Sequence, residues 1–184
     1  REELAFLARA LDEGASGIVI AGDAGVGKSR LAADFVASVG DRSVVRVAAS
    51  ASLRPVPLGA FAPVLPPGLS RAPRQPAEAM RLVADHMAAR ASAPPLVWID
   101  DAHLLDELSA GLVLQLAVGR RAFVVATLRS TEPSPDAVRR LWRDGHARRL
   151  VVCWMAVAGA DHVGGGRGHG GGVDRARASG PGGP

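Results

Sequence analysis

Apolar positions along the chain follow two periods, one typical of helices and one typical of buried strands. Helical spacing predicts five helices, at residues 2–13, 28–39, 77–91, 106–118 and 135–144. Short continuous apolar runs predict five strands, at residues 18–21, 44–48, 96–99, 122–128 and 149–152. Because helices and strands alternate, the pattern predicts a three-layer α/β/α fold around a mostly parallel five-stranded sheet.

Two segments depart from this alternation. Residues 53–76 are rich in proline, which excludes a regular helix or a central strand and predicts a long surface connection. Residues 151–184 hold 11 of the 22 glycines but only 2 of the 18 acidic residues, without a period that would bury one face. We therefore expect one folded domain over residues 1–150. The glycine-rich tail, 151–184, is interpreted either as a flexible, disordered linker or as the product of a shifted reading frame.

Composition narrows the class of protein. With 48% apolar and 22% charged residues, the chain has the composition of a globular domain. The net charge of +4 is a weak indication of nucleic-acid binding, because the arginines are interspersed with acidic residues. Cys153 is the only cysteine, which excludes an internal disulfide and fits a reducing compartment. His162 and His169 lack the spacing of metal ligands, so they predict no metal site.

The location of the protein is inferred from what the chain lacks. The longest apolar run, residues 150–160, is about half of the roughly 20 residues that a membrane span needs. The chain does not open with the pattern of a signal peptide either. We therefore expect a cytoplasmic protein with no membrane partner. Because the chain begins with Arg1 rather than Met, we also expect it to be a fragment or to lack its true start.

The segment between the first strand and the second helix reads GDAGVGKS and matches the phosphate-binding pattern G-x-x-x-x-G-K-[ST]. Glycines let the backbone N–H groups turn towards a phosphate, and the following helix adds its positive end. Lys28, the only lysine, stands where an ammonium would reach the β- and γ-phosphates, and the Ser29 hydroxyl would bind magnesium. The predicted nucleotide-binding residues are Gly22, Asp23, Ala24, Gly25, Val26, Gly27, Lys28, Ser29 and Arg30. The alternative is a glycine-rich turn with a chance lysine, but the flanking strand and helix favour the P-loop.

Two carboxylates follow the third strand, in the segment LVWIDDAH. Open α/β sheets bind their ligands at the carboxyl edge, where these residues would lie. We predict that Asp100 holds magnesium directly or through water, and that Asp101 or His103 orients or deprotonates the attacking water. As an alternative, Asp101 and Asp106 would only cap the next helix, and for Asp106 this is the favoured interpretation.

Arg129 comes directly after the fourth strand. A guanidinium at this place can contact the γ-phosphate of a nucleotide through paired hydrogen bonds, so Arg129 is a third candidate catalytic residue. The alternative is a solvent-exposed arginine in an arginine-rich protein. Arg54, Arg120 and Arg121 have no comparable placement and are expected to be surface charges.

These segments together resemble the STAND branch of AAA-like signalling ATPases, and more narrowly the ATPase domain of large ATP-binding LuxR-type transcriptional regulators of bacteria. The resemblance covers about residues 1–150 and is carried by REELAFL, GDAGVGKSRLAADF, LRPVPLGAFAPVL, LVWIDDAHLLDELSA and VVATLRSTEP. It implies a P-loop NTPase fold in which the strand that carries the sensor lies between the Walker-A and Walker-B strands. It also implies ATP rather than GTP, and an adenine near the opening segment, of which Arg1 and Glu2 are present.

The function that we expect is a nucleotide switch. ATP and Mg²⁺ would order the P-loop and the sensor arginine, and slow hydrolysis to ADP would reset the state. The resemblance implies self-association, and DNA binding only through modules that are not recognisable here. One alternative is a P-loop kinase that transfers the γ-phosphate to a small acceptor, although paired acids followed by a histidine suit hydrolysis better. The other is a truncated nucleotide-binding fragment without activity.

Overall fold

All ten predicted helices and strands are present in the computed structural model, which describes residues 1–66, 75–89 and 93–153. The strands are β1 (Gly17–Gly22), β2 (Val44–Ala48), β3 (Leu96–Asp100), β4 (Phe123–Arg129) and β5 (Arg148–Val152). The helices are α1 (Glu2–Asp12), α2 (Lys28–Ser38), α3 (Pro76–Ala88), α4 (Glu107–Val118) and α5 (Asp136–Arg143), with the short 3₁₀ helices η1 (Gly59–Val64) and η2 (Ala102–Leu104). Predicted and observed ends agree within one residue, except that α3 ends at Ala88, three residues before its predicted end, with Ala89 as its C-cap.

The five strands form one parallel sheet in the order β2-β3-β4-β1-β5. This confirms the predicted fold class. The strand that ends in Arg129, β4, lies between β1 and β3, as the resemblance implied. The register places Gly22 directly beside Arg129, so the start of the P-loop and the predicted sensor meet at one edge of the sheet.

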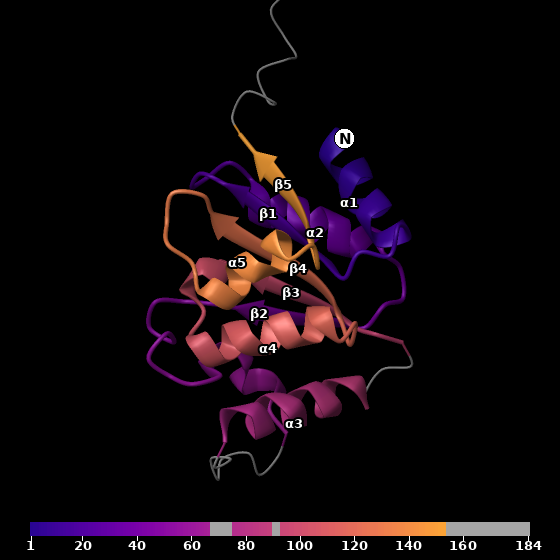
Figure 1. The fold of residues 1–184 in the computed structure, drawn as a ribbon. Coiled ribbons are helices and arrows are strands. Elements are labelled where there is room, and N and C mark those ends of the chain that lie inside the picture. Colours follow the sequence, from indigo (N-terminus) through magenta and orange to yellow (C-terminus); the bar gives the residue numbers. More distant parts are fainter. Residues whose placement is uncertain (67–74, 90–92, 154–184) are drawn as a thin grey trace, which may run out of the picture.

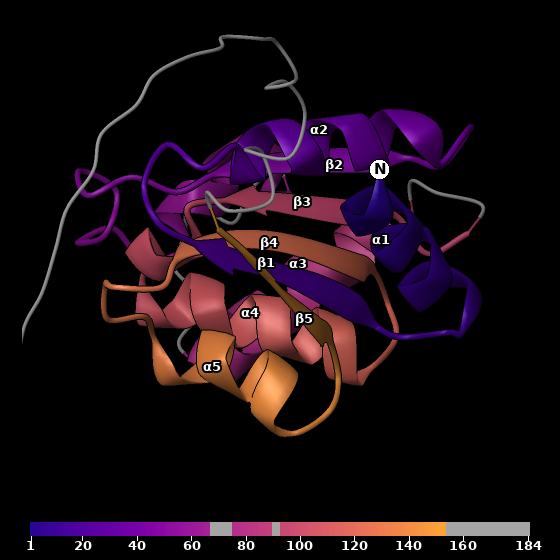
Figure 2. The same ribbon diagram turned by 90° about the horizontal axis from the view of Figure 1, so that it is seen from above.

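Helices cover both faces of the sheet, which gives the three predicted layers (Figures 1 and 2). Helices α1 and α2 pack on one face, against strand residues such as Ile18 and Ile20. Helices α3, α4 and α5 pack on the other face, against the alternate residues Val19 and Ala21. Because successive side chains of a strand point to opposite faces, a central strand between two helical layers must be apolar at every position.

The proline-rich segment is more buried than the sequence predicted. It forms turns and the 3₁₀ helix η1, and Leu58, Ala60 and Phe61 are buried in the core beside α3 and α4. The prediction of a surface connection is therefore wrong for this part of the segment. Prolines prevent a regular ladder of hydrogen bonds, but they do not prevent the apolar residues between them from packing.

The last described strand, β5, extends to Val152, two residues beyond the predicted end of the domain. Cys153, which follows it, is exposed. The remaining tail residues 154–184, with His162 and His169, lie outside the described residues. In the described ranges, no helix is both long enough and apolar enough to cross a bilayer.

Candidate functional site

The phosphate-binding pattern forms a loop between β1 and α2. Gly25 and Gly27 have positive φ angles of 77° and 93°, in the left-handed region that residues with a side chain rarely adopt. A Cβ added at either position would meet no atom within 4 Å, so the loop is open on this side. The backbone conformation therefore requires glycine here, and the space beside the loop is free for a ligand.

The Lys28 side chain lies across its own loop. It is only 6% exposed, and its Nζ donates a hydrogen bond of 2.7 Å to the backbone carbonyl of Asp23. Burial lowers the pKa of Lys28, the Asp101 carboxylate opposes this effect, and the Arg129 guanidinium adds to it. The Lys28 ammonium has one carbonyl partner and little contact with water. A phosphate bound beside it would neutralise its charge and stabilise it.

Asp100, at the carboxyl end of β3, contacts the end of the P-loop. Its Oδ1 accepts hydrogen bonds from Ser29 Oγ at 2.8 Å and from Thr127 Oγ1 at 2.7 Å. Ser29 and Asp100 are 71 positions apart in the chain, and the fold brings their oxygens together. The two residues predicted to hold magnesium are thus adjacent.

Thr127 is a site residue that the sequence analysis missed. Its side chain is fully buried on β4, and its Oγ1 also accepts a hydrogen bond from the backbone N–H of Asp101 at 3.0 Å. It therefore ties together Asp100, the last residue of β3, and Asp101, which follows it. The available signal was a single hydroxyl in the apolar strand FVVATLR.

Asp101 begins the 3₁₀ helix η2 in a strained conformation, with φ 55° and ψ 48°. Its side chain makes no capping hydrogen bond, so capping does not explain its presence. The opposite holds for Asp106, whose side chain accepts from the backbone N–H groups of Leu108 and Ser109 and caps α4. A non-glycine residue held in the left-handed region beside a phosphate loop is typical of functional sites.

His103 is buried between two carboxylates. Its side chain is 1% exposed; Nε2 lies 3.3 Å from Glu132 Oε2, and Nδ1 lies 3.9 Å from Asp101 Oδ1. The Glu132 contact is short but is not aligned as a hydrogen bond, and neither ring nitrogen has a hydrogen-bond partner among the described residues. Burial lowers the pKa of His103, while the carboxylates of Asp101 and Glu132 oppose the shift. Burial therefore favours the uncharged form of the imidazole.

Arg129, the last residue of β4, forms an ion pair within the same turn. Its Nη1 donates to Glu132 Oε1 at 2.7 Å, and about two fifths of each side chain is exposed. Glu132 is the second site residue that the sequence analysis missed. No pattern marked it, because its two contacts come from the fold of the turn after β4.

The other predicted residues are placed as follows. Asp23, Ala24 and Val26 lie in the loop, whereas the Arg30 side chain is exposed on the outside of α2 and lies 3.9 Å from Asp34. Two of the three arginines expected to be surface charges have partners from distant segments: Arg120 donates to the carbonyl of Gly14, and Arg121 pairs with Asp85.

The residues present fit a magnesium ion that is held mainly by phosphate. Ser29 and Asp100 offer one hydroxyl and one carboxylate, which are the oxygen donors that Mg²⁺ prefers. The described part of the chain contains no group of three or more His, Cys, Asp or Glu side chains arranged to hold a metal. Because magnesium usually binds one or two protein ligands together with phosphate oxygens and water, Ser29 and Asp100 would be enough protein ligands for it.

A cavity of about 540 Å³ lies elsewhere, between the proline-rich segment and the start of α4. Its lining includes Arg54, Leu58, Leu65 and Leu108, but no residue of the P-loop. Its walls are mostly apolar and carry no group of catalytic character beyond the capping Asp106 and its neighbour Glu107. The chemistry of the molecule is therefore concentrated at the edge of the sheet.

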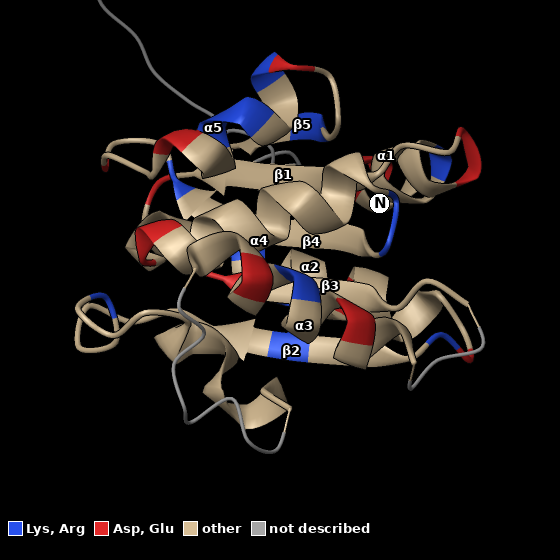
Figure 3. Cartoon of the chain, turned by 60° about the horizontal axis from the view of Figure 1, so that its bottom comes forward, with Lys and Arg blue, Asp and Glu red and all other residues tan. Residues whose placement is uncertain are grey.

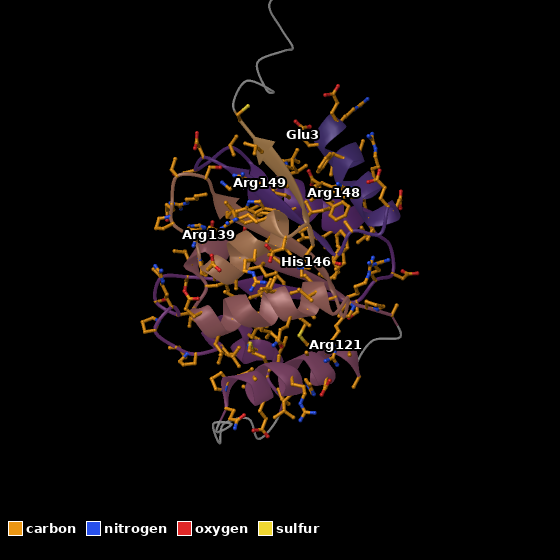
Figure 4. The ribbon with its side chains drawn as sticks, in the orientation of Figure 1. Glu3, Arg121, Arg139, His146, Arg148 and Arg149 are labelled. Carbon is orange, nitrogen blue, oxygen red and sulfur yellow. The ribbon has the colours of Figure 1, made fainter. Side chains whose placement is uncertain are left out.

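Several arginines lie close together on α5 and β5, and Figure 3 shows them as neighbouring blue segments. Arg139, Arg148 and Arg149, labelled in Figure 4, lie on this side of the molecule. Most have local partners: Asp136 for Arg139, Asp144 for Arg140, Glu13 for Arg148 and the ring of Trp142 for Arg149. This agrees with the interspersed charges of the sequence and leaves the P-loop as the candidate site.

Comparison with known families gives a match to the AAA domain over residues 11–133, about two thirds of the chain. The matched region contains the P-loop, both acidic residues after β3, Arg129 and Glu132. No curated protein matches the chain.

Several solved structures share the fold. A chain from the structure of the Drosophila ORC bound to AT-rich DNA has a TM-score of 0.57 at 15% identity, with 82% of this chain and 53% of that chain covered. A STAND protein with a tetratricopeptide repeat sensor from Pyrococcus horikoshii has a TM-score of 0.51 at 17% identity, with 82% and 22% covered. At such identities the likeness shows an α/β fold of the P-loop NTPase kind. This chain spans about half the length of the first of these chains and about a fifth of the second.

Proposed function

The chain belongs to the family of AAA domains, and on this basis we propose that it binds ATP with magnesium and acts as a nucleotide-dependent switch. The observation that carries the proposal is the hydrogen bond of 2.8 Å between Ser29 and Asp100. It joins Ser29, at the end of the P-loop, to Asp100, the last residue of β3. If the segment were only a glycine-rich turn with a chance lysine, a hydrogen bond between Ser29 and a carboxylate 71 positions away would not be expected.

Different residues of the site would bind the phosphates and the magnesium ion. The N–H groups of residues 23–29 and the start of α2 would hold the phosphates. Lys28 would exchange the carbonyl of Asp23 for a phosphate oxygen, and Ser29 and Asp100 would hold magnesium. When bound, magnesium would offset the negative charge that develops on the phosphate oxygens during hydrolysis.

Hydrolysis would depend on the residues that follow β3 and β4. Asp101, held by the hydroxyl of Thr127, and the neutral His103 would orient or deprotonate water. Arg129 would contact the γ-phosphate and so distinguish ATP from ADP. Buried histidines between carboxylates commonly act on protons, which supports a slow ATPase rather than a binding module alone.

The wider role rests on the resemblance of the motifs. They support a cytoplasmic switch module of a bacterial transcriptional regulator of the LuxR type. Self-association of such modules in the ATP state is part of this proposal, and DNA would be bound by other modules of the regulator.

A thermal-shift titration with Mg-ATP tests the binding. A ligand that binds only the folded state at about 100 times its Kd adds about 2.7 kcal/mol of stability. For a chain of this size, the expected rise in Tm is roughly 5–10 °C. Lys28→Ala should abolish the shift, whereas Arg139→Ala, which removes a surface charge on α5, should retain it. A folded protein that shows no shift at millimolar ATP would refute the proposal. Phosphate release that requires a small acceptor would instead indicate the kinase.

A further inference from the structure

Glu132 contacts two residues of the proposed site with its two carboxylate oxygens. Oε1 accepts the hydrogen bond from Arg129 Nη1 at 2.7 Å, and Oε2 lies 3.3 Å from His103 Nε2. The turn that presents it is closed by a backbone hydrogen bond from Glu132 N to Arg129 O at 3.4 Å. One carboxylate thus links the last residue of β4 to the 3₁₀ helix after β3.

This arrangement differs from an ordinary surface ion pair. An exposed pair three residues apart adds little stability, and either partner is free to turn into solvent. Here one side of Glu132 faces a histidine that is 1% exposed and has no hydrogen bond to another described residue. Glu132 Oε2 lies 3.3 Å from His103 Nε2, whereas Asp101 Oδ1 lies 3.9 Å from Nδ1 on the other side of the ring.

The position of Arg129 makes its pairing relevant to nucleotide. It lies beside Gly22 in the sheet, at the start of the P-loop. It is also close enough to Lys28 to affect the electrostatics of that ammonium. The Glu132 carboxylate and a γ-phosphate would compete for the Arg129 guanidinium, because both accept hydrogen bonds from the same N–H groups.

We propose that Glu132 is a positioning residue that holds Arg129 away from the phosphates until a γ-phosphate competes for the guanidinium. This inference rests on the proposed function of the site. ATP would break the Arg129–Glu132 ion pair, whereas ADP, which lacks the γ-phosphate, would leave it intact. Glu132 then sets how strongly the domain distinguishes the two nucleotides.

The test compares ATP and ADP affinities for the 184-residue chain and for the variants Glu132→Gln and Glu132→Ala. Kd values with Mg²⁺ are measured by isothermal titration calorimetry. Without the competing carboxylate, we expect the Kd for ATP to fall about three-fold, in line with the strength of a half-exposed ion pair. The Kd for ADP should not change. In the Arg129→Ala background, Glu132→Gln should leave the ratio of the two affinities as it is.

Glu13→Gln is the matched control, because Glu13 pairs with Arg148 on the surface away from the P-loop. It should leave both affinities unchanged, and circular dichroism melts should show that all variants are folded. Equal changes for ATP and ADP, weaker ATP binding, or an effect that persists without Arg129 would overturn the role of Glu132 and leave nucleotide binding standing. A folded parent chain that binds neither nucleotide would overturn the proposed function, and this inference with it.

Discussion

At the scale of single residues, the Asp100 carboxylate of the candidate site could be predicted from the sequence, whereas the Thr127 hydroxyl could not. Asp100 stood out because it ends an apolar run at the edge where sheets bind ligands. Thr127 became a partner of Asp100 only because β4 lies next to β3 and its register brings the two oxygens to 2.7 Å. Candidate carboxylates at strand ends are therefore easier to predict than the side chains that contact them.

Asp100→Asn tests the proposed magnesium ligand. The variant retains an oxygen that Ser29 and Thr127 can bond, but it loses the negative charge that magnesium prefers. We expect the increase in Tm with ATP to be the same in Mg²⁺ and in EDTA. Asp144→Asn, which removes a surface carboxylate paired with Arg140, should keep the full magnesium dependence. A magnesium-dependent shift that survives in Asp100→Asn would exclude this role.

His103 predicts a pH dependence of stability. Its pKa is lowered in the folded protein by burial, so below the ordinary value of about 6.5 the unfolded chain binds a proton that the folded protein does not. The contribution to stability is therefore complete above about pH 6.5 and is lost as the pH falls towards the lowered pKa. Urea unfolding between pH 8 and pH 5 should show a decline that is shallower in His103→Gln. A decline of the same slope in both proteins would contradict this prediction.

At the scale of elements, Asp106 connects the start of α4 to the proline-rich segment. Its Oδ1 accepts from the N–H groups of Leu108 and Ser109, and also from the N–H of Leu58 at 3.2 Å. The capping function could be predicted from the sequence, because aspartate before an apolar helix is a common N-cap. The bond to Leu58 could not be predicted, because it depends on the path of a segment without regular structure.

Asp106→Ala should destabilise the protein by about 2–3 kcal/mol, since it removes a cap and leaves the buried N–H of Leu58 without its acceptor. Urea unfolding of the variant measures this change. Asp136→Ala at the start of α5 is the matched control, because its exposed side chain makes only a surface pair with Arg139. The control substitution should lower the free energy of unfolding by less than about 1 kcal/mol. Equal costs in the two variants would show that the contact with Leu58 contributes nothing.

At the scale of the whole molecule, β5 completes the sheet beside the strand that carries the P-loop. It pairs with β1 from Ile18 to Gly22, which are buried. Without it, the edge of β1 and part of its apolar surface would face water. The stability of the P-loop strand therefore depends on residues near position 150, where the glycine-rich tail was predicted to begin.

Two truncated chains test this dependence. A chain that ends at residue 147 lacks β5, and a chain that ends at residue 153 retains it. We expect the shorter chain to melt roughly 10 °C or more below the longer one, because it loses the pairing and exposes β1. Thermal melts followed by circular dichroism measure the difference. Equal melting temperatures would show that β5 contributes nothing to the stability of the sheet.

The positions and types of the elements, the fold class and the P-loop could all be read from the chain, because each depends on neighbouring residues. A strand buried on both faces must be apolar throughout, and a phosphate loop needs its glycines and lysine in one short segment. The order of the strands agreed with the resemblance, but periodicity alone did not specify it. Local chemistry was therefore enough to predict a phosphate ligand and the edge of the sheet at which it would bind.

Only the folded structure decided which side chains act together. The burial of His103, the contact of Glu132 with both His103 and Arg129, and the packing of Phe61 in the core join segments that are distant in sequence. Such contacts depend on strand order, register and the path of irregular turns, to which no short pattern corresponds. The proposed phosphate-binding half of the site is thus a property of one segment, whereas its proposed sensing half exists only because η2 and the turn after β4 meet at one edge of the sheet.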